Sequence, residues 1–185
     1  MTFDRDAAVD RAMLVFWRQG YASTTPQGLA DALSIRKGSL YNTFESKHNL
    51  FTLTLRRYGQ MRAPTLRRLR EEQGPVHEVL RSSLAELTGA GSHRMGCFAV
   101  NSVSELAGQD EGVTRVAESL FTDIEDASRV ALERGRTRGE YTGGPDADEQ
   151  ARSFLTAVIG LSVLCKAGTP PDRLDQIIES TLRSM

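Results

Sequence analysis

Hydrophobic residues recur along the chain with the three- and four-residue spacing of amphipathic helices. A first helix before Gly20 has an apolar face formed by Val9, Ala12, Met13 and Phe16. Three later stripes of the same kind lie at residues 76–87, 113–127 and 174–182. No convincing stretch alternates strictly between apolar and polar residues, as a half-buried strand does. The pattern predicts an all-α protein of nine or ten helices.

Two short helices joined by a tight turn are predicted between Thr25 and Phe44. Thr25 precedes Pro26, the preferred order of an N-cap and a first helical residue, and this helix should run to about Leu33. Ser34 and Ile35 form the turn, and the second helix follows directly after them. Such a pair of helices indicates a helix-turn-helix motif.

Longer helices are predicted after this motif. Ser46 should cap a helix that ends before Pro64, because proline disrupts a helix interior. The helix from Asp146 to Lys166 is apolar on nearly every face after Phe154, so it should be buried on more than one side. This favours a homodimer in which that helix and the last one supply half of a four-helix interface. The alternative is a central core helix in a monomer.

The second short helix carries the side chains that a major groove requires. Leu40 and Phe44 lie one turn apart and should pack inward. The outward positions then hold cations for phosphates and guanine edges, hydroxyls for phosphates, and an amide that can read adenine: Arg36, Lys37, Ser39, Tyr41 and Asn42. Gly38 lets the backbone approach the duplex. A helical hairpin inside a larger bundle is the less favoured alternative.

Two further positions suit phosphate binding, and the charge distribution agrees. Lys47 opens the next helix, whose amide end and lysine together could hold a phosphate, and Thr25 has a similar place at the start of its helix. Residues 1–70 hold 12 basic and five acidic side chains, a net charge of +7, whereas the remainder carries −8. A basic segment on an acidic body suggests a polyanion as partner of that segment alone.

The N-terminal segment resembles the TetR family of transcriptional regulators. The resemblance rests on Phe16 to Thr25, Leu29 to Phe44 and Ser46 to Phe51, read together. It implies a DNA-binding domain over residues 1–50 and a helical ligand-binding and dimerisation domain over residues 51–185. It also implies a homodimer on a palindromic operator, most simply a repressor that a small effector releases. Residues 94–107 resemble a stretch of one branch of these regulators, some of which sense electrophiles or oxidants.

The body offers candidate sensing residues. Cys97 follows Gly96 at the expected start of a helix, a position that favours a reactive thiolate, although a free cysteine is often only a small buried hydrophobe. Polar groups on the same helix could orient a ligand in a mostly apolar pocket near Cys97; we expect this pocket to involve Phe98, Asn101, Glu105, Phe121 and Phe154. The polar groups could equally serve as caps or interface contacts.

Other functional classes find little support. The sequence shows no phosphate-binding loop, nucleophile elbow or histidine spacing for a metal, so no cofactor or metal is expected. A small hydrolase built on Glu105 and His93, and a sequence-blind DNA binder, remain as rival hypotheses. No apolar run is long enough for a bilayer, the N-terminus does not read as a signal peptide, and two cysteines make no disulfide framework. We therefore expect a cytoplasmic protein with no membrane partner.

Overall fold

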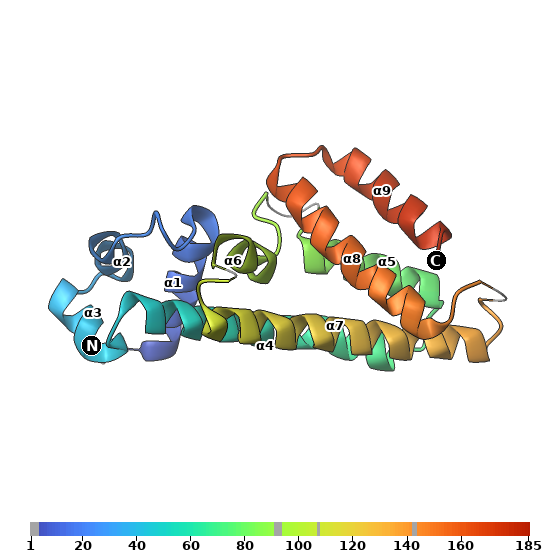
Figure 1. Ribbon diagram of the computed structural model, residues 1–185, viewed down its shortest axis with the longest axis horizontal. Helices are drawn as coiled ribbons and strands as arrows, with labels where there is room; N and C mark the ends of the chain where they lie inside the picture. Colours follow the sequence, from blue (N-terminus) through green and yellow to red (C-terminus); the bar gives the residue numbers. More distant parts are fainter. Residues whose placement is uncertain (1–3, 91–93, 107, 142–143) are drawn as a thin grey trace.

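Helices are the regular secondary structure of the described part of the chain. The structure, a computed structural model, describes residues 4–90, 94–106, 108–141 and 144–185. Within those ranges it contains nine α-helices joined by short connections (Figure 1): α1 (Arg5–Gln19), α2 (Pro26–Leu33), α3 (Lys37–Phe44), α4 (Lys47–Glu71), α5 (Val76–Thr88), α6 (Phe98–Leu106), α7 (Glu111–Thr137), α8 (Ala147–Lys166) and α9 (Pro171–Arg183). This confirms the predicted all-α class.

Capping side chains explain where five of these helices begin. Asp4, Thr25, Ser46, Asp110 and Asp146 each accept a hydrogen bond from a backbone N–H two or three residues further on, at 2.8–3.1 Å. Each bond satisfies an amide that the first turn of a helix leaves without a partner. The starts expected at Thr25 and Ser46 are therefore confirmed.

The predicted end of α4 before Pro64 is wrong. The helix continues through Pro64 to Glu71 and is 25 residues long. Beyond the proline, Thr65, Leu66 and Leu69 are buried in the body, and this packing holds the last two turns in helical form. Pro64 itself is exposed, so the carbonyl that loses its amide partner lies on the solvent side.

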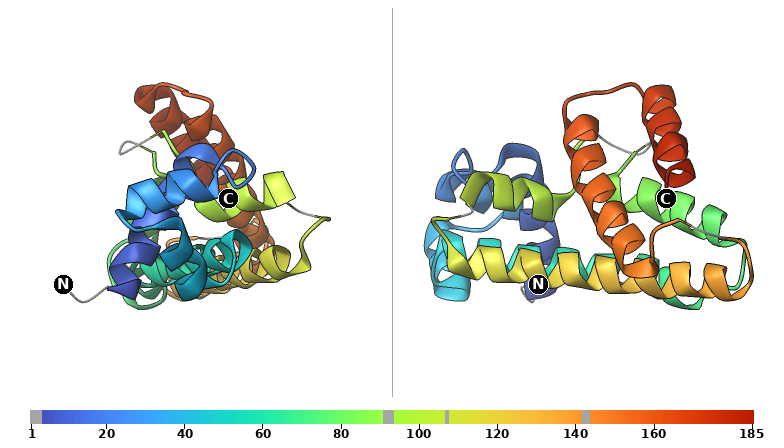
Figure 2. Two further views of the ribbon diagram at one scale, coloured as in Figure 1. Left: turned by 90° about the vertical axis from the view of Figure 1, so that its left-hand side faces the viewer. Right: turned by 45° about the vertical axis from the view of Figure 1, so that its right-hand side comes forward.

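The two longest helices form the axis of the molecule. Figure 1 shows α4 and α7 running side by side, with α1 to α3 at one end and α5, α8 and α9 toward the other. The right-hand view of Figure 2 shows the same arrangement, with α6 between the two ends, where it packs on α4, α7 and α8. We call α1 to α3 with the first turn of α4 the head, and the remaining helices the body.

The hydrophobic core runs without a break from head to body. Aromatic rings connect the two parts, with neighbouring ring centroids 5.0–6.1 Å apart: Phe16, Trp17, Phe51, Tyr58 and Phe98. These rings come from α1, α4 and α6, so all three helices share one packed cluster. Such a cluster resists independent motion of its members, because interiors are packed as densely as organic crystals.

Helix α8 is buried on one side and exposed on the other. Phe154, Val158 and Leu161 face the core, and each is at most 2% exposed. Ile159 and Val163 lie on the open side, where they are 36% and 52% exposed. A single chain therefore leaves part of the apolar surface of α8 uncovered. None of the described helices is both long and apolar enough to cross a membrane.

Candidate DNA-binding surface and its contacts with the body

Helices α2 and α3 form a helix-turn-helix motif with a closed turn. Ser34 adopts a left-handed conformation with φ of 56°, and the amide of Ile35 bonds to the carbonyl of Ala30 at 3.0 Å. This geometry ends α2 and directs the chain into α3 within two residues. Leu33 and Leu40 on either side of the turn are each 2% exposed and pack into the head.

The outer face of α3 is polar, basic and open to solvent. The side chains expected in the major groove are all exposed: Arg36, Lys37, Ser39, Tyr41 and Asn42. Arg36 and Lys37 form no ion pair within the described residues, and α3 contains no acidic residue. A Cβ at Gly38 would meet nothing within 4 Å, so the backbone there is accessible to a duplex. The five side chains predicted to contact DNA are therefore all exposed at the start and on the outer face of α3.

Lys47 has a role inside the head that the sequence did not indicate. Its ammonium nitrogen donates to the carbonyl oxygens of Tyr21 and Thr24, at 3.0 Å each, and lies 4.1 Å from the centre of the Tyr21 ring. These bonds hold the loop between α1 and α2 against the start of α4. Phosphate binding by Lys47 stays a prediction. In the structure its side chain bonds to the loop between α1 and α2.

Glu105 joins the body to the same loop. Its carboxylate accepts hydrogen bonds from the backbone amides of Tyr21 at 2.8 Å and Ala22 at 2.7 Å. Gly20 precedes them with φ of 81°, and a Cβ there would lie 2.8 Å from a Glu105 oxygen. The loop and the carboxylate therefore fit each other closely. We call this contact the Glu105 clasp.

Two further contacts tie the head to the body beside the clasp. The indole N–H of Trp17 in α1 donates to the carbonyl of Gly96 at 3.1 Å, in a buried setting. His48 in the first turn of α4 lies 3.2 Å from Asp110, the capping residue of α7. The clasp, the indole bond and this pair all involve α6 or the chain next to it. Helix α6 and the chain on either side of it therefore add these polar contacts to the packing of α1 on α4.

The buried thiol of Cys97 lies next to a tyrosine with an unsatisfied hydroxyl. Cys97 is 2% exposed, and the Tyr58 hydroxyl makes no hydrogen bond of ordinary geometry within the described residues. Burial raises the pKa of Tyr58, the neighbouring Cys97 adds to the rise, and the Arg62 guanidinium above its ring opposes it. Cys165 is also buried.

The six residues expected around a ligand have varied surroundings, and a ligand site formed by them stays a prediction. Phe98 and Phe154 are buried in the core, and the Asn101 amide donates to the carbonyl of Met95 at 2.8 Å. Glu105 bonds to the head instead, and Phe121 is only partly buried. None of the six lines the cavity of about 400 Å³ between α4 and α7. That cavity has different walls, which no sequence pattern had indicated.

The described residues give no support to a metal site or to the hypothetical hydrolase pair. They contain no cluster of three His, Cys, Asp or Glu side chains that could hold a metal. His93, the second member of the hypothetical hydrolase pair, lies outside the described residues, and its partner Glu105 is occupied by the clasp. The exposed basic helix after a closed turn instead defines a helix-turn-helix DNA-binding protein.

Comparison with known proteins agrees with that class. The model of the bacterial regulatory proteins of the tetR family matches residues 8–53. The chain is 30% identical over 186 residues to the HTH-type transcriptional repressor ComR of Escherichia coli strain K12, covering 98% of this chain and 88% of that protein. It is also 30% identical over 173 residues to the repressor BdcR of the same strain, covering 93% of this chain and 84% of that protein.

The fold extends this similarity over the whole chain. A cysteine mutant of the TetR family regulator CifR, complexed with 26-bp double-strand operator DNA, has a TM-score of 0.85 and 30% sequence identity. The similarity covers 100% of this chain and 98% of that one. The chain belongs to the TetR family. It is a DNA-binding transcriptional regulator and not an enzyme.

Proposed function

We propose that the protein is a homodimeric repressor that binds a palindromic operator through its two heads and leaves it when an effector binds the body. The observation that carries this proposal is the free basic surface of α3 in a head that the body holds through the Glu105 clasp. Such a connection lets a change in the body alter the orientation of the DNA-binding helix. Residues 1–50 would supply DNA contact, and residues 51–185 would supply sensing and dimerisation.

The DNA contacts follow from the exposed set on α3. Arg36 and Lys37 would reach phosphates or guanine edges, Tyr41 and Ser39 phosphate oxygens, and Asn42 an adenine edge. Thr25, whose hydroxyl oxygen caps α2, and Lys47, at the first turn of α4, flank this surface. In a dimer, the two α3 helices should lie about 34–36 Å apart or somewhat more, to meet successive major grooves.

The dimer interface should form on the open side of α8 together with α9. From Thr156 to Cys165 the chain contains no charged residue, and Ile159, Val163 and Leu164 remain exposed in the single chain. Val163→Glu should therefore give a monomer in sedimentation experiments at micromolar concentration. Leu14→Glu is the matched control, because Leu14 is an exposed apolar residue of the head. A wild-type monomer, or a dimeric Val163→Glu variant, would contradict this interface.

The effector would be a small hydrophobic or electrophilic molecule. For an electrophile, the supporting observation is the buried Tyr58 hydroxyl beside Cys97, a polar group that lacks an ordinary partner. Treatment with N-ethylmaleimide should modify Cys97 and release the wild-type protein from DNA, whereas Cys97→Ser should stay bound. If both proteins leave the DNA, the reacting group is not Cys97. If both stay bound, the protein does not sense electrophiles through a thiol.

The central experiment is selection of bound duplexes from a random pool, followed by fluorescence anisotropy. We expect a palindromic consensus, two chains per duplex, and affinity at least a thousandfold above that for random DNA at the same salt concentration. Equal affinity for selected and random duplexes would instead favour a sequence-blind binder.

A further inference from the structure

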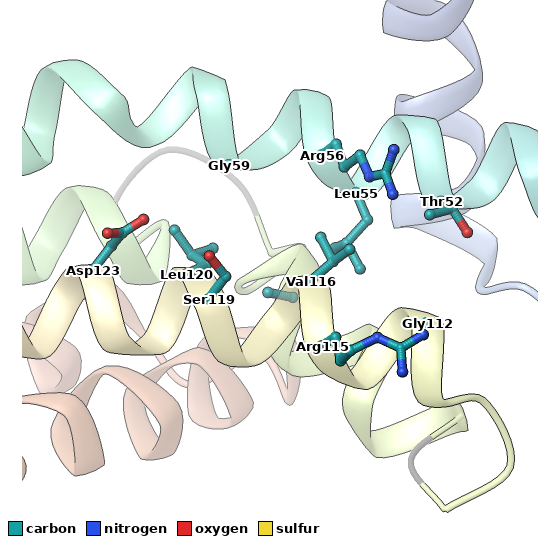
Figure 3. A pocket seen from close by; sticks show the side chains of 11 residues that line it. Thr52, Leu55, Arg56, Gly59, Gly112, Arg115, Val116, Ser119, Leu120 and Asp123 are labelled. Atoms are coloured by element: carbon teal, nitrogen blue, oxygen red, sulfur yellow. The ribbon is translucent and has the colours of Figure 1, made fainter.

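The cavity between α4 and α7 has a shape and lining that suit a small molecule. It measures about 400 Å³, within the range of ligand-binding cavities in proteins. Leu55, Val116, Leu120 and Ala99 provide apolar lining, and Figure 3 shows polar side chains from both long helices along the same opening. The site is separate from Cys97 and from the DNA-binding face of α3.

Gly59 lines the cavity at a position where the fold does not require a glycine. It lies in the interior of α4, where glycine lowers helix stability relative to alanine. A Cβ at this position would meet nothing within 4 Å, and the backbone does not have a positive φ. Neither close packing nor backbone conformation therefore requires the glycine. What it leaves is open space on the α4 wall of the cavity.

Charge is distributed unevenly along the cavity. Arg56 from α4 and Arg115 from α7 lie at the end nearer the head, and Asp123 lies at the opposite end (Figure 3). Arg56 forms no ion pair with any described residue. Arg115 pairs only with Glu111, at 3.3 Å, and both side chains are largely exposed, so this pair is weak. Both guanidinium groups are thus available to an anion, which they bind in preference to neutral groups.

We propose that this cavity binds a monocarboxylate with an apolar body, held by Arg56 and Arg115. Asp123 is eight residues beyond Arg115 on α7, about 12 Å along the helix axis, so the ligand would contain roughly ten non-hydrogen atoms. The negative charge of Asp123 disfavours a second carboxylate at the far end of the ligand. The proposal rests on the proposed function, in that this ligand acts as the effector.

Ligand binding in the cavity would affect the position of the head through α4, which belongs to both parts of the molecule. His48 and Asp110 join the first turns of α4 and α7 at 3.2 Å, on the head side of the cavity. A carboxylate that binds both Arg56 and Arg115 links α4 to α7. It would change the spacing of these two helices next to the contact between His48 and Asp110. Couplings of this kind in proteins change the affinity of the second site by about 5- to 150-fold. Operator affinity should fall by a factor in that range.

Calorimetric titration of the DNA-free protein with octanoate tests the site. Octanamide, which is neutral, and octanedioate, which adds a second carboxylate, should bind at least tenfold more weakly. Arg56→Gln and Arg115→Gln should each lose about tenfold or more in octanoate affinity, as expected for a charge-assisted contact. Arg67→Gln, an exposed arginine of α4 away from the cavity, is the matched control.

Two substitutions at Gly59 separate loss of space from loss of folding. Gly59→Leu fills the cavity from a position with no neighbour within 4 Å, so the protein should stay folded and lose octanoate binding. Gly59→Ala removes little space and should keep binding. Octanoate binding that survives Gly59→Leu or Arg56→Gln, equal binding of octanamide, or no binding at about 10 mM would overturn the assigned site.

The DNA measurements distinguish this inference from the proposed function. Operator binding without octanoate tests the proposed function alone, and octanoate binding without DNA tests the site alone. A fall of 5-fold or more in operator affinity with octanoate, absent in Arg56→Gln, supports the effector role. Octanoate binding with unchanged operator affinity would refute that role.

Discussion

The Glu105 clasp should contribute measurably to the stability with which the body holds the head. Glu105→Ala removes the acceptor of two backbone amides, those of Tyr21 at 2.8 Å and Ala22 at 2.7 Å. A hydrogen bond to a charged group contributes about 1.5–3 kcal/mol. Both amides can bond to water once the carboxylate is gone, because Ala22 is exposed and Tyr21 is only partly buried, so we expect a total loss below the sum of two such bonds, about 1–2 kcal/mol.

This loss should appear in DNA binding as well as in stability. A head without the clasp has more freedom, and part of the binding free energy then goes into ordering it on the operator. A loss of 1–2 kcal/mol corresponds to operator affinity about 5- to 30-fold lower. Removal of a negative charge near DNA would by itself strengthen binding, so the predicted change has the opposite sign to a purely electrostatic effect.

Amide hydrogen exchange gives the direct readout. In Glu105→Ala the amides of Tyr21 and Ala22 should exchange faster, while that of Leu29 inside α2 should not change. Glu118→Ala is the control, because Glu118 is an exposed acid of the body far from the loop. Unchanged exchange at residues 21 and 22 together with unchanged operator affinity would refute the role assigned to the clasp.

Four further substitutions test other parts of the structure. Gly96→Ala should destabilise the protein by about 2–4 kcal/mol in denaturant unfolding, because φ is 66° and the new Cβ would lie 2.5 Å from a carbonyl oxygen of α8. Tyr41→Ala should weaken operator binding without unfolding the protein. Lys47→Ala should weaken binding and lower the salt slope by about one unit, because a phosphate contact is lost; an unchanged slope would leave Lys47 only its contacts within the head. Hydrogen bonding from Arg68 holds the pKa of Glu86 below its ordinary value of 4.5, so its stabilisation is present above that pH and lost as pH falls below it. Glu86→Gln should therefore be less stable than wild type at pH 7, with the difference shrinking near pH 4.

The sequence was informative wherever the deciding interactions are local. The caps at Thr25 and Ser46 depend on residues within one turn, so the starts of α2 and α4 were predictable. Pro64 misled the prediction of the end of α4, because burial of Leu66 and Leu69 against other helices outweighs one missing hydrogen bond.

The Glu105 clasp and the cavity between α4 and α7 depend on residues far apart in the chain, and local sequence patterns do not indicate such contacts. Glu105 is 84 residues from Tyr21, so its polar character was visible but its partner was not. The cavity joins Arg56 to Arg115 across two helices whose relative register no single sequence pattern gives. Gly59, a glycine in the interior of a predicted helix, is the sequence feature that points to the cavity.

The continuity of α4 has a consequence for how far the operator contacts can shift. At 25 residues the helix is about 37 Å long, and it joins the head to the body without a flexible linker. A tilt of about 5° at its body end therefore displaces its first turn by about 3 Å. That displacement is close to the 3.4 Å rise between successive base pairs. In a symmetric pair of chains the two displacements add. Because α4 is so long, a rotation of a few degrees at its body end is enough to shift the two heads out of register with the major grooves.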